Sequence, residues 1–238
     1  MTQFAVILAA AGKSSRFGSP FEKKVYSALA HKPLWLYAAE SFSQRQDVGQ
    51  VLLVIAAEDQ SLFQEKFSRQ AAELGVQIVL GGQHRADSVW QGLQAVRSEL
   101  PLVAIHDAAR PCLTAGAIDA VFAAAQKSGA AILATPCTAT LKRVGPQQTI
   151  TDTVSRENLW LAQTPQVFEK ALLRAAWAAH PNPSAATDEA SLVEAMGRPV
   201  TVVEGSPLNV KVTTRADLEF AELALRALPK PNPFPYGK

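Results

Sequence analysis

A short loop near the start of the chain carries residue types suited to binding phosphate. Residues 4–18 read as a buried strand that runs into a loop of small residues, and the cations Arg16, Lys23 and Lys24 lie in or just after this loop. Small residues let backbone N–H groups approach a phosphate chain closely, and long cations neutralise its charge. The loop has no His, Cys, Asp or Glu before Glu22. Chemistry that needs mainly positive charge and positioning is typical of phosphoryl or nucleotidyl transfer.

Neither of two common phosphate-binding motifs is present in this loop. It lacks the G-x-x-x-x-G-K-[ST] spacing of a P-loop, and Gly12-Lys13-Ser14 alone is a chance match. It also lacks the G-x-G-x-x-G pattern of dinucleotide-binding proteins. An ordinary strand-to-helix turn with solvated cations is the alternative interpretation.

A second candidate segment, His106-Asp107-Ala-Ala-Arg110-Pro111, directly follows the expected strand Leu102–Ile105. A carboxylate at a strand end can hold Mg²⁺ or accept hydrogen bonds from a substrate hydroxyl, and Arg110 can bind a phosphate. The alternative is an Asp–Arg pair that holds the loop in place. We expect His106 to be structural, because its side chain points opposite to that of Asp107 if the strand continues.

The third candidate segment, Gly81-Gly82-Gln83-His84-Arg85-Ala-Asp87-Ser88, follows another expected strand and leads into a helix. Its two glycines would allow close approach to a flat base, and the Ser88 hydroxyl could contact the polar edge of that base. His84 and Asp87 are expected to be exposed or to cap the helix.

Other cations are scattered through the second half of the chain. Lys142 and Arg156 lie on or beside an expected hairpin together with Thr140, and most such cations are solvated surface residues. Lys211 differs, because it lies between Val210 and Val212 in an expected short strand at Asn209–Thr213. No His/Cys cluster has zinc-binding spacing and no G-x-S-x-G motif occurs, so a hydrolytic triad has no support.

Alternating apolar patterns indicate an α/β fold that would bring these segments together. The expected strands are Phe4–Leu8, Val51–Ile55, Val76–Leu80, Leu102–Ile105, Ala130–Ala134 and Val200–Val203. The expected helices are Leu34–Phe42, Leu62–Leu74, Ser88–Val96 and Ala117–Ala125. This alternation is typical of a buried, mainly parallel sheet, in which ligands bind beyond the carboxyl ends of the strands.

One segment interrupts the alternation. Thr138–Val144 and Thr149–Ser155 flank Gly145-Pro-Gln-Gln148 and read as a hairpin. It could project from the body and pack on a second subunit, or it could be an edge hairpin of the same sheet.

The C-terminal quarter contains two helix-capping patterns. Residues 187–191 are expected to open an apolar helix with an N-cap and two acidic residues in its first turn. Thr214 and Asp217 form a capping-box variant for a last helix at Leu218–Leu228, and the proline-rich tail from Pro229 to Lys238 should be loose. No linker or repeat divides residues 1–238, so we expect one domain, with a β-arm at about 137–157.

Composition excludes several classes of protein. With 238 residues and 48% apolar side chains, the chain can bury one sizeable core or at most two small ones, and its net charge of +2 does not favour nucleic acid or membrane surfaces. No apolar stretch reaches the roughly 18 residues of a membrane span. Two cysteines do not form a disulfide framework, and a reducing cytoplasm is the simplest location.

Together these segments resemble the 2-C-methyl-D-erythritol 4-phosphate cytidylyltransferase family of the non-mevalonate isoprenoid pathway. The resemblance runs in order over nearly the whole chain, and nine segments in sequence are more specific than any one of them. They are Ala9-Ala-Ala-Gly-Lys-Ser-Ser-Arg-Phe-Gly18, Lys24-Val-Tyr26, Gly81-Gly-Gln-His-Arg-Ala-Asp-Ser-Val89, His106-Asp-Ala-Ala-Arg-Pro111, Thr140-Leu-Lys-Arg143, Val154-Ser-Arg-Glu-Asn-Leu-Trp160, Gln163-Thr-Pro-Gln-Val-Phe168, Thr187-Asp-Glu-Ala190 and Asn209-Val-Lys-Val-Thr213.

The resemblance implies a Rossmann-like nucleotidyltransferase core, a homodimer paired through a projecting arm, and a role for each matching residue. Cytosine and ribose of CTP would lie among Ala10, Ala11, Gly12, Gly82, Gln83 and Ser88. Arg16 and Lys24 would bind the triphosphate and stabilise the transition state. Asp107, Arg110, Thr187 and Lys211 would line the methylerythritol phosphate side, with Asp107 also near CTP. Thr140 and Arg156 would reach the substrate in the partner's site.

In the implied reaction, the 4-phosphate oxygen of the substrate attacks the α-phosphorus of CTP in line and pyrophosphate leaves. A phosphate monoester is already anionic at neutral pH, so no general base is required. Mg²⁺, held mainly by the CTP phosphates with Asp107 as a possible ligand, would offset the repulsion between two polyanions together with Arg16 and Lys24.

Three departures from the family pattern affect the implied site. The family usually has a glycine where this chain has Ser14, and Pro-Lys-Gln-Tyr where this chain reads Lys23-Lys-Val-Tyr26 with about one extra residue after Arg16. Tyr26 aligns Lys24 with the family lysine, although Lys23 could serve instead. Gln83 stands where the family usually has an acidic residue, which affects the contact with the base.

Three other functions remain open from the sequence. A ribitol 5-phosphate cytidylyltransferase resembles this family in fold and CTP site, and the arm and residues 187–211 would decide between the two. A regulatory protein could bind CTP without turnover, although such a protein would not need the charges of Arg16, Lys24, Asp107 and Lys211 together. A structural α/β domain without activity is the third.

Overall fold

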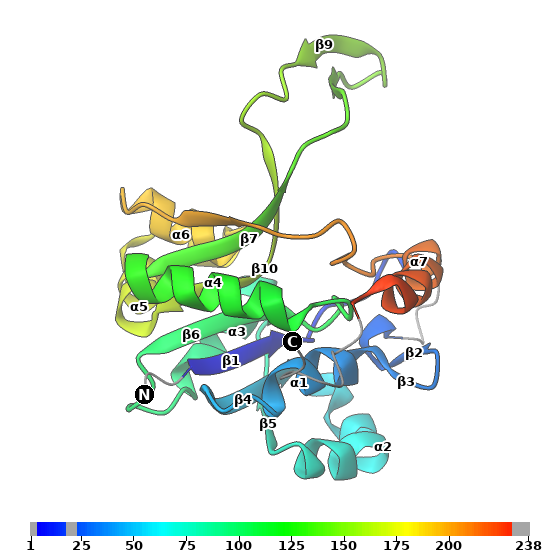
Figure 1. The fold of residues 1–238 in the computed structure, drawn as a ribbon, viewed down its shortest axis with the longest axis vertical. Helices are drawn as coiled ribbons and strands as arrows, with labels where there is room; N and C mark the ends of the chain where they lie inside the picture. Colours follow the sequence, from blue (N-terminus) through cyan, green and yellow to red (C-terminus); the bar gives the residue numbers. More distant parts are fainter. Residues whose placement is uncertain (1–3, 18–22, 230–238) are drawn as a thin grey trace, which may run out of the picture.

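A seven-stranded sheet forms the centre of the molecule in the computed structural model, which describes residues 4–17 and 23–229 (Figure 1). The strand order is β11-β7-β10-β6-β1-β4-β5. The strands are β1 (Phe4–Ala9), β4 (Val48–Ile55), β5 (Val76–Leu80), β6 (Leu102–Asp107), β7 (Ala130–Pro136), β10 (Trp160–Glu169) and β11 (Thr201–Glu204). The six strands predicted by apolar runs are confirmed, and the resulting α/β fold with a mainly parallel sheet is the predicted one.

The strand β10 was not predicted, and it is the one strand of this sheet that runs antiparallel to both of its neighbours, β6 and β7. The strand has no continuous apolar run, because the polar residues Gln163, Thr164 and Gln166 lie inside it and are buried. A buried polar side chain needs a hydrogen-bond partner, and the partners of these three come from distant segments.

Helices cover both faces of the sheet and bury its apolar side chains. Apolar residues of α1 (Leu34–Ser43), α2 (Gln60–Glu73) and α4 (Ala115–Ser128) pack on one face. Residues of α3 (Arg85–Gln94), α5 (Lys170–Ala179) and α6 (Glu189–Ala195) pack on the other. Alternate residues of β1 point to the two faces, as the pleat of a strand requires: Val6 joins the first cluster and Ile7 the second.

A third, smaller core lies near the carboxyl ends of the strands. It joins α7 (Arg215–Ala227) to the loop after β1 through buried residues that include Phe17, Val212 and Ala221. The remaining short elements are the turns η1 (Lys24–Tyr26), η2 (Ala57–Asp59) and η3 (Pro183–Ala185), and the paired strands β2 (Ala28–Leu29) and β3 (Lys32–Pro33). Leu29 of β2 belongs to the small core, whereas η3 lies against α3. This core anchors the segment that carries Lys211.

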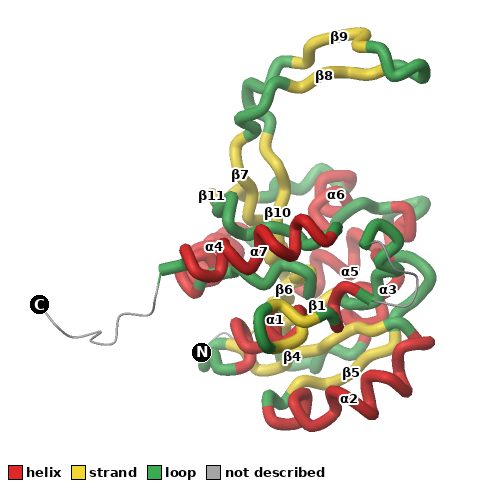
Figure 2. The backbone as a smooth tube through the Cα atoms, turned by 90° about the vertical axis from the view of Figure 1, so that its right-hand side faces the viewer, coloured by secondary structure: helices red, strands yellow, loops and turns green. Residues whose placement is uncertain are grey.

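The hairpin of β8 (Leu141–Val144) and β9 (Ile150–Val154) projects from the body (Figures 1 and 2). It sits at the tip of an arm whose base is the extension of β7 and β10, where Trp160 pairs with Pro136. The hairpin pairs with itself and not with the seven-stranded sheet, so the projecting arrangement is the correct alternative and the edge hairpin is wrong.

Two details of the C-terminal quarter differ from prediction. The N-cap of α6 is Asp188, whose carboxylate accepts the Ser191 N–H at 3.1 Å, so Glu189 is left as the one acid of the first turn. Asn209–Thr213 is not a strand but an irregular segment that leads into α7. The capping box of Thr214 and Asp217 is confirmed at the start of α7.

Two further predictions concern membrane-spanning helices and the C-terminal tail. In the described part of the chain, no helix has the length and apolarity that crossing a membrane would require. Most of the predicted loose tail lies outside the described residues.

Candidate active site

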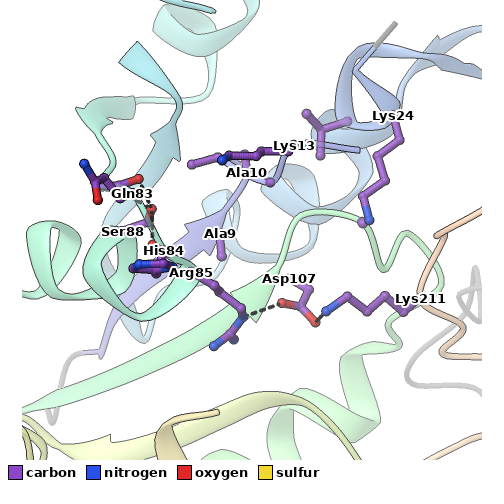
Figure 3. Close-up of a pocket in the computed structure, with 15 residues that line it drawn as sticks. Ala9, Ala10, Lys13, Lys24, Gln83, His84, Arg85, Ser88, Asp107 and Lys211 are labelled. Atoms are coloured by element: carbon purple, nitrogen blue, oxygen red, sulfur yellow. Dashed lines mark hydrogen bonds and ion pairs between the residues drawn. The ribbon is translucent and has the colours of Figure 1, made fainter. Parts of the chain in front are cut away.

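A cavity of about 340 Å³ lies beyond the carboxyl ends of β1, β5 and β6 (Figure 3). The strands β1 and β6 are parallel neighbours, with Ala9 in register with Asp107, so the segments that follow them emerge side by side. The residues that line the cavity are Ala9, Ala10, Ala11, Gly12, Lys13, Lys24, Val25, Gly82, Gln83, His84, Arg85, Ser88, Asp107, Ala109 and Lys211. All three candidate segments of the sequence therefore meet here, together with Lys24 and Lys211.

The loop after β5 requires its two glycines because the chain packs closely on itself there. A Cβ at Gly81 would lie 2.6 Å from Ser88 Oγ and 2.9 Å from the Ala11 Cβ, and a Cβ at Gly82 would lie 2.5 Å from the Asp87 Cβ. These distances are shorter than a carbon contact allows. Gly81 thus lets this loop lie against the one that follows β1, and Gly82 lets it turn tightly into α3. Residues of both loops line the cavity.

The Ser88 hydroxyl shapes this loop from the first turn of α3. It accepts the Gly82 N–H at 3.2 Å and donates to the His84 carbonyl at 3.0 Å, and the residue is buried. The His84 N–H donates to Asp87 Oδ2 at 3.1 Å, so the predicted capping role of these two residues is confirmed. Gln83 is exposed at the cavity, and its side chain is free to meet a ligand there.

Lys24, and not Lys23, supplies its side chain to the cavity. Lys23 Nζ pairs with Glu58 at 3.0 Å and with Asp59 at 3.1 Å, on the other side of η1. Lys24 lines the cavity, and its Nζ makes no ion pair with any described residue. Burial, followed by the charge of Lys211, lowers the pKa of Lys24. The negative charge of an anion in the cavity would oppose both effects and raise the pKa of Lys24.

Asp107 lies at the end of β6 among three cationic side chains. Its carboxylate is 2.9 Å from Lys211 Nζ, 3.4 Å from Arg85 Nε and 3.5 Å from Arg110 Nε. Burial alone would raise the pKa of Asp107, but the charges of these three residues outweigh burial and hold the pKa well below its usual range. Asp107 is therefore ionised at neutral pH and balances only part of the positive charge around it.

Arg110 is held largely by the protein itself. Its Nη1 donates to the Asn209 carbonyl at 2.7 Å, and the residue is 9% exposed. The Arg110 side chain thereby fixes the segment that carries Lys211. The alternative interpretation of the Asp–Arg pair as a structural contact is partly correct, although Arg110 also lines the second cavity described below.

His106 is structural, as predicted. Its side chain is fully buried and packs against the ring of Phe42. Its Nδ1 lies 3.0 Å from Thr164 Oγ1 and its Nε2 lies 3.2 Å from the Arg110 carbonyl. Because the carbonyl can only accept, the proton is assigned to Nε2, and burial lowers the pKa of His106 to about 4.

A second cavity of about 230 Å³ adjoins the first. It is lined by Arg85, Asp107, Arg110, Ala162, Gln163, Thr164, Gln166, Thr187, Asp188 and Lys211. The residues Arg85, Asp107 and Lys211 line both cavities and form the boundary between them, and Figure 3 shows Asp107 between the two cations. The site thus offers two adjacent compartments that meet at a charged wall.

Arg85 is a site residue that the sequence analysis missed. Its guanidinium binds Glu189 through two hydrogen bonds, at 2.8 and 3.1 Å, and also contacts Asp107. Its position in the first helical turn after the glycine pair was a usable signal, but its partner Glu189 is 104 residues away. Lys13 also lines the larger cavity, although it was not among the predicted site residues.

Three predicted site residues do not line either cavity. Arg16 is exposed in the loop after β1. Thr140 and Arg156 lie on the arm, where Arg156 donates to the Thr138 carbonyl, and neither residue lines a cavity of its own chain. The arm projects away from the sheet and its helices (Figure 1).

The donor set does not form a metal cage. Among the residues that the structure describes, no group of three His, Cys, Asp or Glu side chains is placed to hold a metal ion. Asp107 is a single carboxylate already surrounded by three cations, and the Asp188 carboxylate accepts from Gln166 and from the backbone of Ser191. A divalent cation would need phosphate oxygens of a bound ligand for most of its coordination.

The comparisons with known proteins agree with this geometry. A family model described as IspD, 2-C-methyl-D-erythritol 4-phosphate cytidylyltransferase, matches residues 4–227. A protein of that name from Rhodopirellula baltica is 40% identical over 232 residues, which cover 93% of this chain and 94% of the relative. Another from Pelotomaculum thermopropionicum is 40% identical and covers 95% of this chain and 96% of the relative.

A solved structure is also similar. The crystal structure of 2-C-methyl-D-erythritol 4-phosphate cytidylyltransferase from Thermus thermophilus superposes with a TM-score of 0.77 at 33% identity, covering 94% of this chain and 99% of the other. The family-model match spans almost all of the described residues, including both cavities and the arm. The chain therefore belongs to the 2-C-methyl-D-erythritol 4-phosphate cytidylyltransferase family.

Proposed function

We propose that this chain transfers CMP from CTP to 2-C-methyl-D-erythritol 4-phosphate in isoprenoid biosynthesis, giving 4-diphosphocytidyl-2-C-methyl-D-erythritol and pyrophosphate. Membership of the family over residues 4–227 supports the activity. The single structural observation that carries it is the pair of adjacent cavities divided by Asp107, Arg85 and Lys211. Two substrates that must react with each other need two such compartments with a common boundary.

CTP would occupy the larger cavity. The loops at residues 10–12 and 82–83 would surround the base and ribose, and the triphosphate would lie near Lys24 and Lys211. The Ser88 hydroxyl already bonds within the loop, so in this proposal it acts on the base by shaping Gly82 and His84. The lowered pKa of Lys24, caused by burial and by Lys211, supports this arrangement, because a polyanion relieves the repulsion between the two cations.

The acceptor would occupy the smaller cavity, with its hydroxyls near Asp107 and Thr187. Its phosphate oxygen then attacks the α-phosphorus in line, the bond between the α-phosphorus and the bridging oxygen breaks, and pyrophosphate leaves. Lys24 and Lys211 would stabilise the charge that develops on the transferring group. A phosphate monoester is ionised at neutral pH, and no proton has to be removed.

We retain Mg²⁺ as the proposed cofactor, bound mainly through the phosphates of CTP. The described protein groups supply at most the Asp107 carboxylate, so we assign no step of the reaction to the ion. A reducing cytoplasmic location is likewise proposed, and the two buried, unpaired cysteines Cys112 and Cys137 are consistent with it.

We also propose a homodimer in which the arm of one chain completes the site of the other. The arm exposes large apolar side chains, with Val144 at 54%, Ile150 at 64% and Leu161 at 56%. A hairpin is marginally stable alone, and such side chains would be covered by a partner. Thr140 and Arg156 would then approach the acceptor phosphate in the partner's smaller cavity.

The test is pyrophosphate release from CTP in the presence of Mg²⁺, with methylerythritol 4-phosphate and ribitol 5-phosphate compared as acceptors and ATP, GTP and UTP as alternative nucleotides. Release with CTP and methylerythritol 4-phosphate alone is the expected result. Release with ribitol 5-phosphate instead would show that the enzyme is a cytidylyltransferase with ribitol 5-phosphate as its acceptor. Binding of CTP with no release from either acceptor would overturn the proposal and favour a regulatory protein.

A further inference from the structure

Ser14 has an unusual backbone conformation in the loop that follows β1. Its φ angle is 54°, in the left-handed region that favours glycine, although it carries a side chain. Its Oγ accepts the Lys24 N–H at 3.1 Å and lies 3.5 Å from the Gly12 carbonyl, to which it can donate. The hydroxyl therefore joins the cavity loop to the turn η1, ten residues along the chain.

The Ser14 backbone makes a second contact, which closes the turn that contains Arg16, the other residue that the family resemblance assigns to the triphosphate. Its carbonyl accepts the Phe17 N–H at 2.9 Å and closes a turn that contains Arg16. Phe17 is buried in the small core beside α7, so this turn is anchored at its far end. One residue thus joins the segments that carry Arg16 and Lys24.

The other contacts of η1 fix its opposite side. Lys23 pairs with Glu58 and Asp59, and the Tyr26 hydroxyl donates to Asp59 Oδ2 at 3.2 Å. These contacts hold η1 to η2, at the start of α2, and not to the loop that lines the cavity. Within the described part of the chain, the loop that lines the cavity is bonded to the backbone of Lys24 through the hydrogen bond from the Lys24 N–H to Ser14 Oγ.

We propose that the Ser14 hydroxyl is a positioning group for Lys24 in the transfer reaction. The inference rests on the proposed function. The Ser14 hydroxyl bonds the backbone of the lysine whose side chain lines the larger cavity. A left-handed conformation favours glycine over a residue with a side chain. The hydrogen bond from the Lys24 N–H to the Ser14 hydroxyl offers a reason for serine at this position.

The decisive variant is Ser14→Gly, because glycine accepts a φ of 54° and removes only the hydroxyl and its carbon. We expect kcat to fall by about three- to tenfold, the usual consequence of losing one hydrogen bond, while KM for CTP changes by less than about twofold. Ser14→Ala also lacks the hydroxyl and tests the same point if the glycine variant folds poorly. Ser15→Gly is the matched control, since Ser15 is exposed in the same turn.

A double-mutant cycle separates positioning of Lys24 from a general effect on the loop. In a Lys24→Ala background, which is expected to be slow but measurable at high enzyme concentration, Ser14→Gly should have no further effect on kcat. The proposal is overturned if Ser14→Gly is as fast as the parent, or if it lowers kcat equally with and without Lys24. Parent activity with CTP and methylerythritol 4-phosphate is measured first, so that a failure of the proposed function is seen independently.

Discussion

Asp107 is the residue at which the charges of the site meet. One buried carboxylate lies within 3.5 Å of nitrogen atoms of Lys211, Arg85 and Arg110. Burial, followed by the positive charge of Lys211, lowers the pKa of Lys24. The site therefore has more positive charge than its own carboxylate balances, which suits a ligand with several phosphates.

At this scale, Lys24 and Lys23 form a natural pair of variants. We expect Lys24→Ala to lower kcat by about 10²–10³-fold, because Lys24 lines the larger cavity, where CTP is proposed to bind and where Lys24 can act on developing charge. Lys23→Ala should lower kcat by only a few-fold, because Lys23 pairs with Glu58 and Asp59 outside the cavity. Steady-state pyrophosphate release measures both, and equal losses would contradict the assignment of Lys24.

His106 predicts how stability depends on pH. Its pKa in the folded protein is about 4, against 6.5 for the free side chain, because the ring is buried. Between these values the unfolded chain binds the proton and the folded chain does not. The stability that this residue contributes is complete above pH 6.5 and falls by about 3 kcal/mol as the pH is lowered to 4.

Urea unfolding at pH 7, 5.5 and 4.5 measures this dependence, with His106→Asn as the control. The variant should be less stable at pH 7 but should lose less stability on acidification. The same slope in parent and variant would show that other groups cause the dependence.

At the scale of elements, Arg85 and Glu189 connect α3 with α6. These helices lie on the same face of the sheet and frame the larger and the smaller cavity respectively. Arg85 begins α3 directly after the loop proposed to bind the base, and Glu189 begins α6 two residues after Thr187. The two hydrogen bonds of this pair therefore hold the start of α3 to the start of α6 beside the wall that the two cavities share.

A double-mutant cycle tests this connection. Glu189 is 2% exposed, so Arg85→Met or Glu189→Met alone should destabilise the protein by about 3–5 kcal/mol, since each leaves a buried charge without its partner. The double variant should lose much less than the sum, as measured by urea unfolding. In folded variants, KM for the acceptor should rise more than KM for CTP, and additive losses of stability would contradict the pairing.

At the scale of the whole molecule, the arm separates some proposed site residues from the site. Thr140 and Arg156 lie outside both cavities of their own chain, and the arm carries them away from the body (Figure 2). In a symmetric pair, each arm could serve the other subunit's cavities. The described core of one chain would then supply Lys24, Asp107 and Lys211, and its partner's arm would supply Arg156.

Subunit mixing tests this arrangement. Arg156→Ala and Lys24→Ala homodimers should each be nearly inactive, but a mixed dimer would have one site with both residues intact. After random exchange of equal amounts, about half of the dimers are mixed, and each mixed dimer has one intact site out of two. The mixture should therefore regain about a quarter of the parent activity. Mixtures no more active than the two variants alone, although exchange is shown by differently tagged chains, would contradict the shared site.

Local patterns in the sequence were enough to predict most of the elements. The apolar runs of β1, β4, β5, β6, β7 and β11 mark strands, and the Thr214–Asp217 capping box marks the start of α7, because these signals depend on neighbours in sequence. The strand β10 was missed because Gln163, Thr164 and Gln166 are buried by partners elsewhere in the chain.

By itself, the sequence determined the α/β class, the segments that converge on the site and, by resemblance, the family. Only the tertiary structure decided which lysine enters the cavity, since Lys23 is drawn away by acids 35 and 36 positions further along. Tertiary contacts likewise revealed Arg85 and decided that the arm projects from the body. The physical reason is the same for the lysine, for Arg85 and for the arm: each depends on contacts between residues far apart in the chain. Local patterns indicate only which side chains are apolar enough to be buried and where helices begin.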